Sequence, residues 1–164
     1  MELSKKMEEA LNKQLNAELF SSFLYLSMAA DFQSKNFTGF AAWLEAQAKE
    51  ENEHAMKFYR YILERGGKIK LLAIDAPKNE WQTPLEAFQD TYEHEKKVTN
   101  MIYKLLELAI EEKDFATQEM LQWFVKEQVE EEAQTSQIVE QLKIIGESKN
   151  GWFMLDHRLG KRKE

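Results

Sequence analysis

The chain has 164 residues, a formal net charge of −7 and no cysteine. The length allows one domain with a real core, and the absence of cysteine excludes disulfides, thiolate-bound zinc and Cys-ligated iron–sulfur clusters. The negative charge disfavours a general nucleic-acid binder. The uncharged run Leu19 to Ala30 is too short to cross a membrane, and the N-terminus does not resemble a signal peptide. We therefore expect a cytoplasmic protein with neither nucleic acid nor membrane as partner.

The first half of the chain predicts two long helices. The first runs from about Ser4 to Ser34, and a break at Lys35-Asn36 separates it from a second that ends at Gly66-Gly67. The next segment, Lys68 to Gln82, has no helical period. It is long enough to run the length of a helix, so the third helix is expected to start beside the second and parallel to it.

Two further helices and a short terminal piece follow. The third helix begins at Thr83-Pro84-Leu85-Glu86, a strong N-terminal signal. Asp114 caps the fourth, which ends at Gly146. An amphipathic piece from Trp152 to Leu159 and the basic tail Lys161-Arg162-Lys163 close the chain. Since the remaining connections are short, the sequence predicts an up-down-down-up bundle over 1–146, with 147–164 as a short helix and tail of the same domain.

Each predicted helix carries polar residues on its apolar stripe near its middle. They are Glu18, Glu51 with His54, Glu95 and Gln128. The midpoints of equal helices meet at one level in a bundle, so these side chains should converge in the core. Converging carboxylates are costly unless cations neutralise them, and neither Lys nor Arg lies on these stripes near that level. The pattern predicts a metal site.

The ligand types narrow the choice of metal. Glu51 and His54 lie one helical turn apart and can hold one ion together. A set of carboxylates with one imidazole suits iron or manganese better than structural zinc, and two metals sharing one carboxylate are consistent with it. The alternative is that the apolar stripe of each helix is assigned one residue out of register, so that these polar side chains do not face the core. We expect Trp123 to pack in the core, and His94 and His157 to lie at the surface.

The motifs together resemble the ferritin family, and most closely the non-haem bacterial ferritins. The resemblance rests on Glu18 with Tyr25, Glu50-Glu51-Asn52-Glu53-His54, Tyr92-Glu93-His94-Glu95 and Gln128, and it covers nearly the whole chain. It implies a ferritin-like up-down-down-up four-helix bundle with a long crossover between helices 2 and 3 and a short fifth helix. It also implies an iron-storage cage of 24 subunits. Each subunit would oxidise Fe(II) to Fe(III) with dioxygen or hydrogen peroxide at a di-iron ferroxidase centre.

The same resemblance assigns roles to residues. Glu18, Glu51 and His54 would hold one iron, and Glu51 would bridge to a second iron held by Glu95, with Gln128 close by. Tyr25 joins this catalytic set. A third iron site maps to these positions: Glu50, Glu127, Glu130 and, as a further candidate, Glu131.

Departures from related families limit what is carried over. Asn52 stands where haem-bearing bacterioferritins carry Met, and Gln128 and Glu131 stand where they carry Glu and His, so no haem is expected. Rubrerythrins usually add a Cys-rich iron domain, which a chain without cysteine cannot contain. Gln118 and Leu121 occupy positions that are acidic in the channels of animal cages, which leaves the route of iron uptake open.

Three other readings remain. A non-catalytic mineral-holding subunit would lack His54 or Glu51, and a miniature DNA-protecting cage would build its metal site between subunits. A plain helical bundle for signalling or scaffolding would carry surface Glu and bind no metal. Apolar side chains outside the core stripes favour subunit contacts over a monomer; they are Phe20, Phe23, Trp43, Tyr59, Trp152 and Phe153.

Overall fold

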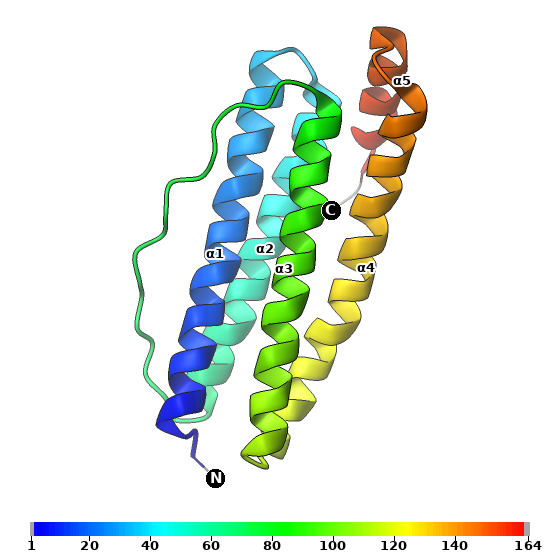
Figure 1. Cartoon of the computed structure of the whole chain (residues 1–164). Coiled ribbons are helices and arrows are strands. Elements are labelled where there is room, and N and C mark those ends of the chain that lie inside the picture. Colours follow the sequence, from blue (N-terminus) through cyan, green and yellow to red (C-terminus); the bar gives the residue numbers. More distant parts are fainter. Residues whose placement is uncertain (1, 163–164) are drawn as a thin grey trace.

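The computed structural model describes residues 2–162, so Lys163 of the predicted basic tail lies outside the described residues. Its elements are α1 (Lys5–Ser34), α2 (Thr38–Glu64), α3 (Pro84–Glu111), α4 (Phe115–Ile145) and α5 (Lys149–Leu159). Figure 1 shows α1 and α4 running one way and α2 and α3 the other, with the crossover lying along α1. The predicted up-down-down-up topology is confirmed. None of the helices within 2–162 is long and apolar enough to span a membrane.

The ends of the long helices follow local signals in the sequence. The side-chain oxygens of Ser4, Thr83 and Asp114 each accept the backbone N–H three residues later, at 3.0, 3.1 and 3.1 Å. These bonds satisfy donors that the first helical turn leaves free. Gly66 and Gly146 end two helices with φ of 75° and 64°, in the left-handed region that favours glycine.

The helix α5 starts three residues earlier than the pattern of apolar residues predicts. The hydroxyl of Ser148 accepts the backbone N–H of Gly151 at 3.2 Å, which places the helix start at Lys149 instead of Trp152. Ser148 is a good N-cap, so the cap signal outweighs the position of the first apolar side chain.

A close contact joins α5 to the start of α2. The first turn of α2 has no side-chain cap of its own, and the carboxylate of Asp156 accepts the backbone N–H of Phe40 at 2.8 Å instead. The two backbones approach so closely that a Cβ on Gly39 would lie 1.8 Å from the carbonyl oxygen of Asp156. Only glycine fits there, so this contact fixes the position of α5 against the start of α2.

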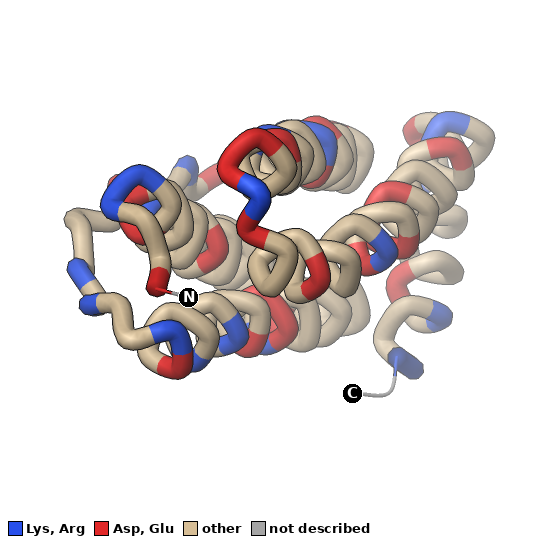
Figure 2. The backbone as a smooth tube through the Cα atoms, turned by 90° about the horizontal axis from the view of Figure 1, so that it is seen from below, with Lys and Arg blue, Asp and Glu red and all other residues tan. Residues whose placement is uncertain are grey.

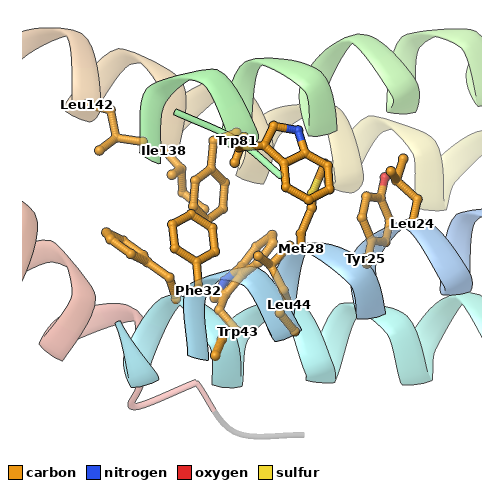
Figure 3. Packing of buried hydrophobic residues seen from close by; sticks show 14 of the residues in the cluster. Leu24, Tyr25, Met28, Phe32, Trp43, Leu44, Trp81, Ile138 and Leu142 are labelled. Carbon is orange, nitrogen blue, oxygen red and sulfur yellow. The ribbon is translucent and has the colours of Figure 1, made fainter. Parts of the chain in front are cut away.

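The core consists of two apolar clusters with a polar layer between them. One cluster surrounds Phe32, Phe40 and Phe88 and includes Trp81 from the crossover (Figure 3). The other surrounds Leu11, Phe58 and Phe124 near the opposite end of the bundle. Seen along its long axis, the bundle places its four long helices around a common centre, with α5 to one side (Figure 2). The polar layer therefore lies at mid-height, where the sequence predicts it.

The outer surface differs from the prediction at Trp43, and the predicted outer residues Phe20, Tyr59 and Trp152 are half-buried against the core clusters. Trp43, expected among the outer apolar side chains, is 5% exposed and belongs to the core. Phe23 and Phe153 are exposed as expected, at 48% and 52%. Ile144 and Met154 add a larger apolar area at the junction of α4 and α5, since they are 86% and 75% exposed.

Candidate metal centre

The four long helices bring the predicted polar side chains into one buried layer. All of them are at most 4% exposed, and they are Glu18, Glu51, His54, Glu95, Gln128 and Glu131. Each comes from a stretch of helix whose flanking turns belong to the two apolar clusters. Helical period alone therefore directs these side chains inward together with their apolar neighbours.

The first group within this layer joins α1 and α2. Glu18, Glu51 and His54 each offer a ligand atom within 4.8 Å of the others. Nδ1 of His54 lies 3.1 Å from Oε2 of Glu51 and 3.9 Å from Oε2 of Glu18. Oε1 of Glu18 accepts from Gln14 at 3.1 Å, whereas its Oε2 is buried without a hydrogen-bond partner. An orphaned carboxylate oxygen aimed at an imidazole and a second carboxylate fits a bound cation.

The second group adds α3 and α4. Glu51, Glu95 and Glu131 also offer ligand atoms within 4.8 Å of one another. Glu51 therefore belongs to both groups and is placed to bridge two cations. The amide of Gln128 donates to Oε2 of Glu95 at 3.1 Å, and the hydroxyl of Tyr25 donates to Oε1 of the same carboxylate. Tyr25 and Gln128 therefore fix the orientation of Glu95.

The third group differs from the predicted third site. It contains His54, Glu127 and Glu131, with Nε2 of His54 3.8 Å from Oε1 of Glu127. Glu130 is exposed and belongs to none of the groups formed by residues 2–162. Glu50 is also absent from them, because its carboxylate pairs with Arg162 at 3.0 Å. A surface cavity of about 390 Å³ between α2 and α4 reaches this position.

Two residues near the centre were not predicted from the sequence: Gln47, which contacts its carboxylates, and Arg162, which contacts Gln47. The amide of Gln47 donates to Glu51 at 3.2 Å and to Glu131 at 2.5 Å. Gln47 could have been found from the sequence, because it is a polar residue on the apolar stripe of α2, one turn before Glu51. Nη1 of Arg162 donates to the side-chain oxygen Oε1 of Gln47 at 3.0 Å, and nothing in the helical periodicity predicts that a residue of the tail reaches this layer.

The other predicted aromatic and histidine positions gave mixed results. His157 is exposed as expected. The prediction for His94 is wrong, because it is half-buried, with a ring nitrogen 2.7 Å from the hydroxyl of Ser21; burial lowers its pKa to about 4. The prediction for Trp123 is also wrong. The residue is 39% exposed, and its ring packs edge-on against His54.

The electrostatics of the layer favour protons on its carboxylates when metal is absent. Burial raises the pKa of Glu51 well above its usual value, and the charges of Glu95 and Glu18 raise it further. Burial raises the pKa of Glu95 to about 7, against the opposing hydrogen bonds from Tyr25 and Gln128. It raises the pKa of Glu131 to about 9. A divalent cation would replace these protons, because metal ligands must be deprotonated.

Comparison with known proteins places this geometry in context. The sequence model of the ferritin-like domain family matches residues 8–145. A bacterial non-heme ferritin of Bacteroides fragilis strain 638R is 44% identical over 98% of this chain and 99% of the relative. One of Staphylococcus aureus strain MRSA252 is 41% identical over 98% and 96%. A solved structure, an open pore ferritin from the hyperthermophilic archaeon Archaeoglobus fulgidus, is 52% identical with a TM-score of 0.97, covering 98% and 99% of the two chains.

Proposed function

Because the chain belongs to the ferritin family, we propose that it is a cytoplasmic iron-storage protein with ferroxidase activity. Its buried acidic layer oxidises Fe(II) to Fe(III) with dioxygen or hydrogen peroxide. A cage of 24 copies encloses the ferric mineral. The observation that carries the proposal is the position of Glu51, whose carboxylate is shared by two ligand groups inside one bundle.

The two ligand groups suit a reaction in which two ferrous ions act together. Each Fe(II) gives up one electron, and the pair reduces one dioxygen to hydrogen peroxide, or one hydrogen peroxide to water. Water supplies the oxygen of the hydrated ferric oxide and releases protons. Two adjacent ions bridged by one carboxylate deliver both electrons to one oxidant. The apolar clusters on either side keep bulk water away from the layer.

The protein side chains have separate tasks in this scheme. Glu18 and His54 hold one ion, Glu95 and Glu131 hold the other, and Glu51 contacts both. Tyr25 and Gln128 keep the Glu95 carboxylate in one orientation through their hydrogen bonds. A ligand that is already oriented loses less conformational freedom on binding, so these two residues favour rapid assembly of the centre.

Iron titration of the purified apo-protein tests the proposal. Fe(II) is added in air, and the ultraviolet absorbance of the ferric product is followed. The parent is expected to oxidise iron rapidly, and Glu51→Gln is expected to lose the rapid phase. Glu45→Gln, an exposed glutamate of the same helix, serves as the matched control and should match the parent. If Glu51→Gln oxidises iron at the parent's rate, Glu51 is not a ligand and the proposed centre is wrong.

A further inference from the structure

Arg162 connects the C-terminal segment to the acidic layer through Gln47. Both hydrogens of the Gln47 amide are used, since its nitrogen donates to Glu51 and to Glu131 at 3.2 and 2.5 Å. Its oxygen accepts from Nη1 of Arg162 at 3.0 Å. Once Glu51 and Glu131 are ionised, as metal ligands must be, their carboxylates only accept, and a guanidinium only donates. The amide therefore satisfies both sides in one orientation alone, and Arg162 lies one side chain away from the carboxylates of the centre.

The guanidinium is held by more than this amide. Nη1 also donates to the carbonyl oxygen of Trp43 at 3.1 Å, and the guanidinium carbon lies 4.5 Å from the centroid of the Trp43 ring. Nη2 pairs with Oε1 of Glu50 at 3.0 Å. Only 15% of the Arg162 side chain is exposed. The fork of donors and the stacking surface are features that arginine has and lysine lacks.

Contacts between α5 and the start of α2 position Arg162 next to Gln47 and Glu50. The helix α5 is fastened to the start of α2 by the hydrogen bond between Asp156 and Phe40. Gly160 follows so closely that a Cβ there would lie 2.9 Å from the Cα of Gly39. The backbone N–H of Arg162 then donates to the carbonyl oxygen of Leu159 at 3.1 Å. In Figure 2 this end of the described chain is the blue stretch before the grey terminus.

Glu50 is the acidic residue that pairs with Arg162 in this arrangement. Its neighbour Glu51 faces the centre, and Glu127 and Glu131 form a ligand group with His54 nearby. Glu50 contributes no atom to that group and is bound to Arg162 instead. The third position thus shares His54 and Glu131 with the first two groups, and only Glu127 belongs to it alone. The positive charge of Arg162 lies one side chain away from Glu131, where it disfavours a cation.

We propose that Arg162 is a positioning residue that holds Glu50 away from the third cation position formed by His54, Glu127 and Glu131. The inference rests on the proposed function, because it concerns the same centre. Arg162 weakens the third position in two ways, by occupying the carboxylate of Glu50 and by placing a positive charge next to it. An ion held weakly there is released easily, which suits a position that passes iron onward.

Calorimetric titration of the apo-protein with Zn²⁺, which is not oxidised, tests this without relying on activity. The binding phase that disappears in Glu127→Gln is assigned to the third position. In Arg162→Gln this phase is expected to tighten by about fivefold, the effect of one charge pair near a surface. Arg158→Gln is the matched control, because Arg158 lines a surface cavity together with Arg162 and Glu50 but bonds Gln141; it should leave the phase unchanged. Arg162→Lys keeps the charge and should fall between parent and Arg162→Gln.

The double variant Arg162→Gln with Glu50→Gln tests whether the tighter Zn²⁺ binding depends on the carboxylate of Glu50. Part of the affinity gained in Arg162→Gln should be lost in the double variant. Glu50→Gln alone changes a half-buried side chain at the surface of α2 and should leave the fold intact. It should weaken the phase, because the charge of Arg162 is then no longer paired with a carboxylate. This variant tests the inference even if Arg162→Gln fails to fold. If the third Zn²⁺ binding phase is unchanged in Arg162→Gln or in Glu50→Gln, the inference is wrong. The proposed centre still stands in that case, provided that the first two binding phases are present. A parent that binds no Zn²⁺ within the bundle overturns the proposed function and this inference together.

Discussion

At the scale of single residues, the buried carboxylates make the apo-protein less stable than its apolar core would allow. Replacing Glu51 by Gln keeps the shape and removes an ionisable group whose pKa is raised by burial and by its acidic neighbours. We expect the apo variant to be at least as stable as the apo parent at neutral pH. Its gain in melting temperature with anaerobic Fe(II) should be smaller, because binding to the folded state supplies that gain.

Thermal unfolding with and without Fe(II) measures both effects. The exposed control Glu45→Gln should stay within about 0.5 kcal/mol of the parent and keep the full metal-induced gain. A clear loss of apo stability in Glu51→Gln at pH 7 would contradict the account, because it would mean that the ionised carboxylate stabilises the fold.

The same carboxylates predict the pH dependence of apo stability. The pKa of Glu131 is about 9 in the folded protein against an ordinary value of 4.5. Between these values the folded state binds more protons than the unfolded state, so the free energy of unfolding falls as pH rises. Glu95, with a pKa of about 7, contributes to the lower part of this window. Denaturant titrations of the apo-protein across it should show this fall, and Glu131→Gln should flatten it. An equally steep slope in Glu131→Gln would disprove the assignment.

How much of the centre the sequence reveals depends on whether a residue lies on a helical stripe. Glu18, Glu51, Glu95 and Gln128 are readable because one helical period fixes the direction of each side chain. Glu50 is different, because its orientation is set by Arg162, which folds back from a part of the chain without periodicity. Pairings of this kind depend on tertiary contacts that no local pattern encodes.

At the scale of elements, the attachment of α5 to α2 depends on one buried carboxylate. Asp156 is 8% exposed and supplies the acceptor that the first turn of α2 lacks. Asp156→Ala leaves the N–H of Phe40 without a partner, and we expect a loss of about 1–3 kcal/mol in unfolding free energy. Asp156→Asn keeps an acceptor oxygen and should lose less. Asp75→Ala, at an exposed crossover residue, should be neutral in the same denaturant titration. Equal stability of Asp156→Ala and the parent would contradict this role.

The long elements were predictable because strong local signals coincide with the hydrophobic pattern. Thr83 and Asp114 mark helix starts that the structure confirms, and the length of the crossover determines that α2 and α3 run parallel. The start of α5 was missed, because Ser148 caps a first turn that carries no buried apolar residue. Short helices offer too little periodicity to outweigh a single cap.

At the scale of the whole molecule, each bundle contains all the side chains of the proposed centre, whereas storage of a mineral requires an enclosure. The side chains of the centre all come from one chain, so rapid oxidation should not depend on assembly. The surface where α4 meets α5 is the strongest candidate for a contact between copies. Its cavity of about 320 Å³ is lined by apolar side chains that include Ile144 and Met154.

Placing a charge on this surface separates assembly from oxidation. Met154 is 75% exposed in the single chain, so Met154→Asp should leave the bundle folded. If copies pack there, burying the new carboxylate is costly and the native particle should be smaller. Native mass measurement should give the cage for the parent and for Met154→Leu, and smaller species for Met154→Asp. The smaller species should still oxidise Fe(II) rapidly but retain little ferric mineral. A full-size particle from Met154→Asp would remove this surface from the assembly, and a monomeric or dimeric parent would refute the cage itself.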